Sequence, residues 1–149
     1  MIDTPCITET VAQPLAFIHL TIPRDEIRHV MDPGLSEILA ALADQCIEPS
    51  GPRLTHHLRI APEIFDFEIC VPVETPVRPV GRVQAGQWPA MTVARAVYEG
   101  PYGGLPRAWK EFNDWVADNG HSAAGDLWER YVSRPPRASR TELIRPIAS

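Results

Sequence analysis

The chain has 149 residues, of which 44% are hydrophobic and 22% are charged, a composition typical of one folded domain with a substantial core. It holds no run of about 20 apolar residues, so no membrane-spanning helix is expected. The net charge is −5, which provides no basic surface for a nucleic-acid backbone, and direct nucleic-acid binding is therefore not expected.

The first predicted elements are a strand and a helix. Residues 11–23 are rich in β-branched and aromatic side chains and partly alternate, which favours a strand, and Pro14 within it indicates a bulge or an edge position. Residues 33–45 carry an apolar stripe at helical spacing, with Asp32 as the expected N-cap and Pro33 as the first helical residue. The segment between these elements is expected to be a loop with a helical turn.

Two strands follow, and the same order then returns. Residues 53–60 and 63–73 alternate apolar and polar side chains around Ala61-Pro62 and predict a hairpin. The second half predicts strands at 80–87 and 91–98, a helix at 105–119 and a final strand pair at 127–133 and 140–147.

This order suggests an internal duplication. Sliding the chain by 74 residues aligns residues 8–75 with 82–149 without a gap and gives nine identical pairs. Three features keep their register, namely a turn glycine, a hairpin proline and a strand-ending proline. They are the pairs Gly51/Gly125, Pro62/Pro136 and Pro72/Pro146.

The predicted fold is therefore α+β. Two β-α-β-β units, about 1–76 and 77–149, form a single domain over residues 1–149 with an antiparallel sheet. Both helices are expected on one side of that sheet, with a central cleft between the units as the place for a ligand.

Several motifs resemble one known family. They are Tyr98-Glu-Gly-Pro-Tyr-Gly-Gly-Leu105, Ala108-Trp109, Gly125-Asp-Leu-Trp-Glu-Arg-Tyr131 and Arg140-Thr-Glu-Leu143. In these residues the chain resembles the GyrI-like small-molecule-binding domain, which also serves as the effector-binding part of some AraC- and MerR-type regulators. The resemblance implies the duplicated fold and a cleft for drug-like compounds that are often cationic and aromatic.

The resemblance also implies site residues. The family's acidic cleft residue, in the strand after the second helix, corresponds to Glu129, and the nearby aromatic position corresponds to Tyr131. The chain departs from the family at Glu99, where a hydrophobic residue or a histidine is usual, and at His57, where an aromatic is common. It shows no helix-turn-helix segment, so a stand-alone binder is expected.

Glu129 and Tyr131 lie two residues apart on a predicted strand, so they share a face. A half-buried carboxylate is costly unless it is paired, so Glu129 either meets a cation of the ligand or pairs with an arginine of the chain. Aromatic walls would add a cation–π attraction of about 0.5–2 kcal/mol.

Four further residues are candidates for the cleft. Tyr102 is interpreted as a lid or a turn filler, and Trp88 as a cleft wall at a strand entry. Trp109 is interpreted as a ligand contact or as helix core. His57 is of interest because the 74-residue offset makes it the counterpart of Tyr131.

Metal and cofactor sites are not expected. His56 and His57 are adjacent on a strand and point to opposite faces, and the other histidines show no ligand spacing. Cys6, Cys46 and Cys70 are also too widely spaced for a metal site, and an odd number of cysteines indicates a reducing, cytoplasmic location. The acidic segment 1–10 does not resemble a targeting signal.

The favoured function is that of a stand-alone protein that binds a small organic molecule. The expected ligand is aromatic, and cations are among the candidates. One alternative is a hydrolase of a reactive small molecule, with Glu129 as base or nucleophile and Tyr131 or Tyr102 as proton donor. A second alternative is an inhibitor that acts on a larger protein partner through an acidic surface. A haem carrier is disfavoured because no histidine stands out as an axial ligand.

Overall fold

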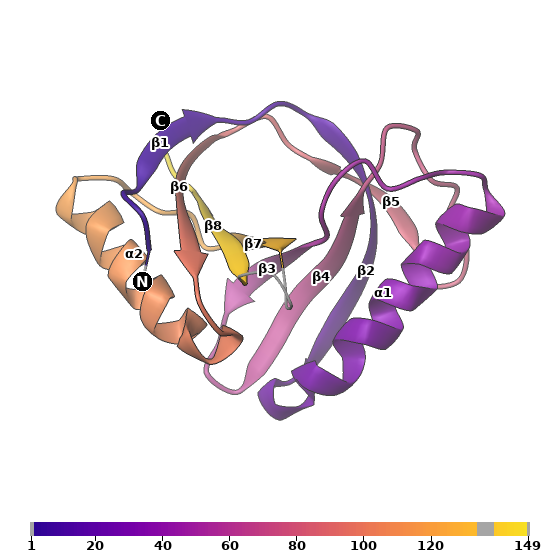
Figure 1. Cartoon of the computed structure of the whole chain (residues 1–149), viewed down its shortest axis with the longest axis horizontal. Coiled ribbons are helices and arrows are strands. Elements are labelled where there is room, and N and C mark those ends of the chain that lie inside the picture. The colour runs from indigo at the N-terminus through magenta and orange to yellow at the C-terminus, as the bar shows by residue number, and fades with distance from the viewer. Residues whose placement is uncertain (1, 134–138, 149) are drawn as a thin grey trace.

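The computed structural model describes residues 2–133 and 139–148, which form an eight-stranded sheet with all neighbouring strands antiparallel and two helices (Figure 1). This confirms the α+β class. The strands are β1 (Cys6–Glu9), β2 (Gln13–Pro23), β3 (Leu54–Ile60), β4 (Ile64–Pro72), β5 (Gln84–Trp88), β6 (Thr92–Glu99), β7 (Leu127–Ser133) and β8 (Arg140–Pro146). The helices are α1 (Ile27–Asp44) and α2 (Leu105–Asp118), each preceded by a short 3-10 turn, Arg24–Glu26 and Tyr102–Gly104.

Both helices pack on the same face of the sheet, as predicted. On β4, Ile69 belongs to the core cluster under α1, whereas its neighbour Cys70 faces the other side. On β7, Leu127 packs with α2, whereas Trp128 faces the other side. Figure 1 shows the helices on opposite sides of the central strands β7 and β3, so they flank the middle of the sheet and leave it open between them.

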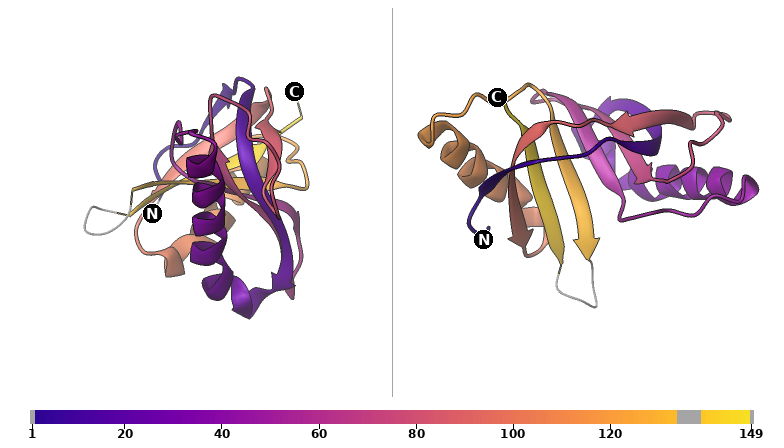
Figure 2. Two further views of the ribbon diagram at one scale, coloured as in Figure 1. Left: turned by 90° about the vertical axis from the view of Figure 1, so that its right-hand side faces the viewer. Right: turned by 90° about the horizontal axis from the view of Figure 1, so that it is seen from above.

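The strand order is symmetrical. It reads β1-β6-β8-β7-β3-β4-β2-β5, and exchanging each strand for its counterpart in the other half gives the same order in reverse. The short strands β1 and β5, which begin the two repeats, each pair with the other repeat, β1 with β6 and β5 with β2. The connections that lead out of β1 and β5 pass each other (Figure 2), where the Thr10 and Met91 backbones are hydrogen-bonded.

The alignment without a gap requires correction. Ile27 and Leu105 begin the two helices, an offset of 78 residues, whereas Asp44 and Asp118 end them, an offset of 74. The first helix is therefore one turn longer, and only the part after the helices keeps the predicted register. Of the matched prolines, Pro136 lies outside the described residues.

Two predictions about prolines were wrong. The first helix begins at Ile27, so Pro33 lies inside it and is not its first residue. The packing of Ile27, Val30 and Met31 against the core offsets the free-energy cost of the backbone hydrogen bond that a proline cannot donate. Strand β2 lies between β4 and β5 and is not an edge strand. Pro14 is tolerated because it lies one residue beyond the β2–β4 register, which begins at Leu15.

The glycine-rich motif after β6 makes room for a tyrosine. The Tyr98 hydroxyl donates to the Pro101 carbonyl at 2.8 Å, and the side chain is buried. Any side chain at Gly104 would collide with that hydroxyl, and Gly100, at φ 151°, also lies against the ring. These glycines therefore hold the turn that leads into α2 close to the sheet.

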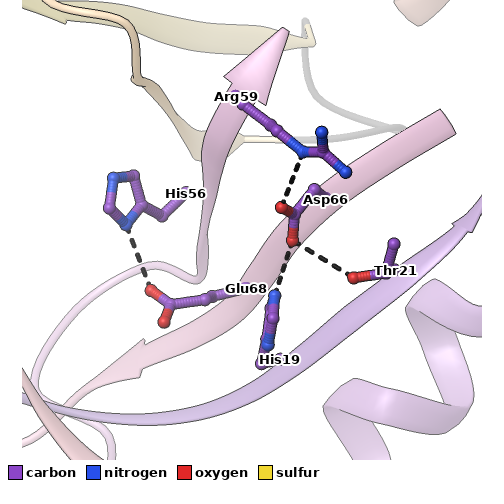
Figure 3. Close-up of polar contacts among 6 residues, drawn as sticks. All are labelled: His19, Thr21, His56, Arg59, Asp66 and Glu68. Atoms are coloured by element: carbon purple, nitrogen blue, oxygen red, sulfur yellow. Dashed lines mark hydrogen bonds and ion pairs between the residues drawn. The ribbon is translucent and has the colours of Figure 1, made fainter. Parts of the chain in front are cut away.

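The face of the sheet opposite the helices carries polar contacts as well as core side chains. Asp66 accepts hydrogen bonds from His19, Thr21 and Arg59 (Figure 3). Beside it, His56 is hydrogen-bonded to Glu68 at 3.1 Å and to Asp126 at 2.7 Å and stacks on Trp128. His56 and Glu68 come from the first repeat, and Asp126 and Trp128 from the second, so this contact connects the two repeats.

Among the described residues, no helix has both the length and the apolar character needed to cross a membrane.

The His56 contact predicts a pH-dependent stability. Burial by itself lowers the pKa of His56, but the hydrogen bonds to Asp126 and Glu68 outweigh it and leave the pKa above its ordinary value of 6.5. The protonated imidazole therefore stabilises the fold below about pH 6.5, and this contribution is lost as the pH rises through the raised pKa of the folded protein. The pKa of Asp126 is lowered, chiefly by the hydrogen bond with His56, so its share is lost only in acid, below about pH 4.

We expect H56Q to lower the free energy of unfolding most between about pH 4 and 6.5, and less as the pH rises beyond that range. Urea denaturation across the pH range measures this difference. H29Q, at an exposed histidine, is the control and should follow the wild type throughout. A cost of H56Q that stays constant with pH would contradict the assignment.

Candidate ligand-binding site

A cavity of about 680 Å³ lies on the helix-bearing face of the sheet. The central strands β3 and β7 form its floor, and the two helices with the turns before them form its walls. The strands contribute Thr55 and His57 from β3 and Leu127, Glu129 and Tyr131 from β7, and Arg53 lies just before β3. The helical segments contribute Arg24, Ile27 and Met31 from the first and Tyr102, Leu105 and Trp109 from the second.

The centre of the floor coincides with the pseudo-twofold axis of the repeats. Thr55 and Glu129 are 74 residues apart and lie directly opposite each other in the β3–β7 register. Positions on either side of this pair are matched in the same way. The matched pairs that line the cavity are Arg24/Tyr102, Ile27/Leu105, Arg53/Leu127, Thr55/Glu129 and His57/Tyr131.

Glu129 is held at this centre by neutral donors. The Trp109 indole nitrogen donates to one carboxylate oxygen at 2.6 Å, and the Tyr131 hydroxyl donates to the other at 2.7 Å. Thr55 in turn donates to the Tyr131 oxygen at 2.9 Å. The carboxylate is only 9% exposed, so these hydrogen bonds replace much of its lost hydration.

Glu129 has no ion-pair partner among the arginines, lysines and histidines in the described part of the chain. The sequence left open that an arginine would pair with Glu129, and none of the described arginines forms this ion pair. The carboxylate is positioned by hydrogen bonds from uncharged donors.

The titratable neighbours of Glu129 are held in their neutral forms. Burial lowers the pKa of His57, although Glu129 acts in the opposite direction, so this imidazole is uncharged at neutral pH. Burial and then the negative charge of Glu129 raise the pKa of the Tyr131 hydroxyl well above its usual value. Tyr131 therefore remains a hydrogen-bond donor across the physiological range.

Aromatic rings surround the carboxylate. Tyr102 meets Tyr131 edge to face, with ring centroids 6.0 Å apart, and it is 43% exposed at the mouth of the cavity. His57 stacks on Phe67, and Phe65 lies close to both. Trp109 is both core and lining, since it packs on Phe112 while its nitrogen contacts Glu129.

Five of the six predicted site residues thus line one cavity, and Trp88 does not join them. Trp88 ends strand β5, pairs with Gln13 and packs against Trp128 on the opposite face of the sheet, with ring centroids 4.5 Å apart. Because side chains alternate between the two faces of a strand, Trp128 points away from the face of its neighbour Glu129. Trp88 packs on Trp128 and therefore lies on that other face too.

Other lining residues were not predicted from the sequence. Thr55 could have been found as the counterpart of Glu129 at the 74-residue offset, and Arg53 as its neighbour on the same face. Arg24 could not have been found in this way, because its position in the lining depends on the first helix being longer than the second. Its guanidinium lies 4.3 Å from the Phe65 ring centroid. Among the described residues, no group of three histidine, cysteine or acidic side chains comes together as a metal site.

Comparison with known proteins points to one family. The model of the family described as "GyrI-like small molecule binding domain" matches residues 54–148. No curated protein sequence gives a significant match to the chain.

Solved structures show the same fold at low sequence identity. The C-terminal domain of EcmrR is 18% identical, with a TM-score of 0.84 and 98% of each chain covered. In the EcmrR–DNA complex, this chain spans 57% of the EcmrR chain, at 19% identity and a TM-score of 0.83.

Two further structures are similar in fold. SAV2435, solved bound to tetraphenylphosphonium, is 11% identical with a TM-score of 0.71, and the match covers 99% of this chain and 95% of that one. A hydrolase from Listeria innocua is 10% identical with a TM-score of 0.65, covering 97% and 91%.

The hydrogen bonds to Glu129 predict unequal effects of two similar substitutions. Y131F removes one of the two donors from a buried carboxylate, and we expect it to lower the free energy of unfolding by about 1–3 kcal/mol. Y102F removes a hydroxyl that has no hydrogen-bond partner among the described residues, so it should change stability little. Urea denaturation of both variants measures the difference, and equal effects would argue against the Tyr131–Glu129 bond.

Proposed function

This chain belongs to the GyrI-like small-molecule-binding domain family, and we propose that its main cavity binds a small aromatic molecule, with Glu129 as the anchor for a cationic group. One observation carries the proposal: a buried carboxylate lies among aromatic side chains, positioned by two neutral donors and without a cationic partner in the described chain.

The physical argument concerns the empty and the occupied cavity. In the empty cavity, hydrogen bonds from Trp109 and Tyr131 stabilise the charge of Glu129. A lipophilic cation would add direct charge compensation, and its rings would pack on Tyr131, Trp109 and Phe65. Such a cation is also weakly hydrated, so it loses little on leaving water. The cavity volume of about 680 Å³ lies within the range of small-molecule sites.

The relative SAV2435, which shares the fold, was solved with tetraphenylphosphonium, and this cation is therefore a suitable first probe. Tetraphenylborate is its matched anion, since four phenyl rings surround a central atom in both ions. Comparing the two separates the contribution of charge from that of shape.

We expect tetraphenylphosphonium to raise the melting temperature of the wild type more than tetraphenylborate does. At about 100 times the dissociation constant the stabilisation is about 2.7 kcal/mol, or about 5–10 °C for a chain of this length. E129Q should weaken binding of the cation about tenfold or more and should not weaken binding of the anion, because the carboxylate repels an anion. D32N, at an exposed acid on the cavity rim, is the control and should behave as the wild type. Equal binding of the cation to E129Q and wild type would refute the anchor.

A second candidate function is hydrolysis, and the direct hydrogen bond between Tyr131 and Glu129 favours it. Glu129 would take a proton from water as the water oxygen attacks an electrophilic carbon. The bond from that carbon to its leaving oxygen breaks, and Tyr131, protonated by virtue of its raised pKa, gives the leaving oxygen a proton. The proton on Glu129 then returns to Tyr131.

Conversion of styrene oxide to its diol, lost in E129Q and in Y131F, would establish this activity, and its absence in the wild type would argue against hydrolysis of epoxides.

A further inference from the structure

A second cavity, of about 360 Å³, lies beside the main one. The two share Arg53, Tyr102 and Tyr131, so these side chains form the boundary between them. The rest of the second cavity is formed by the helix α1, by Val71 of β4, by the chain before β3 and by the end of β7.

The second cavity is apolar and open to solvent. Leu39, Tyr102 and Val132 are large hydrophobic side chains that remain 39%, 43% and 43% exposed, and all three line it. Leu35 and Pro52 continue the same surface. Exposed apolar side chains gathered around a hollow favour a site for the apolar part of a ligand.

Arg53 is the charged residue among the described residues of this second lining, and none of them provides an acceptor for its Nε. Its Nε is buried without a hydrogen-bond partner, and its guanidinium carbon lies 5.2 Å from the centroid of the Tyr131 ring. No carboxylate in residues 2–133 and 139–148 pairs with it. By contrast, Arg59 and Arg95 each form an ion pair with a carboxylate. A guanidinium with an unsatisfied buried donor is a position at which an added acceptor gains free energy.

From these observations we propose that the second cavity is a subsite for an organic anion. The carboxylate of the ligand binds the Arg53 guanidinium, and its hydrocarbon part lies on Leu35, Leu39 and Val132. Arg53 lines both cavities, but Glu129 lies in the lining of the main cavity only, so the second cavity presents the charge of Arg53 without that carboxylate. This goes beyond the function proposed above and does not require Glu129.

The matched probes are 4-phenylbutyrate and its uncharged amide, 4-phenylbutyramide, with binding measured by isothermal titration calorimetry. We expect the wild type to bind the carboxylate about tenfold or more tightly than the amide. R53Q should remove this difference, and R53K, which keeps the charge and loses the planar donors, should retain part of it. R82Q, which removes the same charge at an exposed arginine paired with Glu37, is the control and should bind as the wild type does.

Leu39→Glu locates the subsite, because a carboxylate placed in the second cavity should weaken binding of 4-phenylbutyrate. Circular dichroism of each variant verifies the fold. The proposal is overturned if the wild type does not discriminate the acid from the amide, if R53Q still does, or if Leu39→Glu binds the acid unchanged. If the wild type binds 4-phenylbutyrate in this pattern but does not bind tetraphenylphosphonium, the anion subsite is supported and the role of Glu129 as a cation anchor is refuted. If it binds tetraphenylphosphonium but does not bind 4-phenylbutyrate in this pattern, the cation anchor is supported and the anion subsite is refuted.

Discussion

The hydrogen bonds that hold the buried Glu129 carboxylate connect almost every part of the cavity. Trp109 reaches it from α2, Tyr131 from its own strand β7, and Thr55, through Tyr131, from β3 of the other repeat. One carboxylate therefore fixes the position of a helix over the sheet and the junction of the two repeats. Its remaining charge is what distinguishes this cavity from an ordinary apolar gap between helices.

The fold is nearly symmetrical, but the chemistry of the cavity is not. Thr55 and Glu129 are equivalent by the duplication and lie opposite each other, yet one is a neutral donor and the other a carboxylate. His57 is likewise the counterpart of Tyr131, and Arg53 the counterpart of Leu127. On the floor of the cavity, the first repeat thus contributes Arg53, Thr55 and His57, and the second contributes Glu129 and its donor Tyr131. A duplicated scaffold supplies a cleft with two similar walls, and divergence of the two copies makes the two sides of the cleft chemically different.

The exchange of β1 and β5 between the repeats makes the positions of the two helices depend on each other. Each repeat begins with a strand that completes the sheet of the other one, and the central β3–β7 pair joins the repeats a second time. The His56 contact with Glu68 and Asp126 adds a third link on the opposite face. These links hold the two walls of the cavity at a set separation, so the cavity is largely formed before a ligand arrives.

The sequence alone determined the features that depend on neighbouring residues. Alternation and helical spacing identified the main strands and both helices, and two-residue spacing placed Glu129 and Tyr131 on one face. The tertiary structure alone decided the partners of Glu129, the distant position of Trp88 and the burial of the Arg53 Nε without an acceptor among the described residues. Local patterns show only to which side of a strand a side chain points. What it meets there is set by the register between strands distant in the chain and by how the helices lie across them, and no local pattern encodes these.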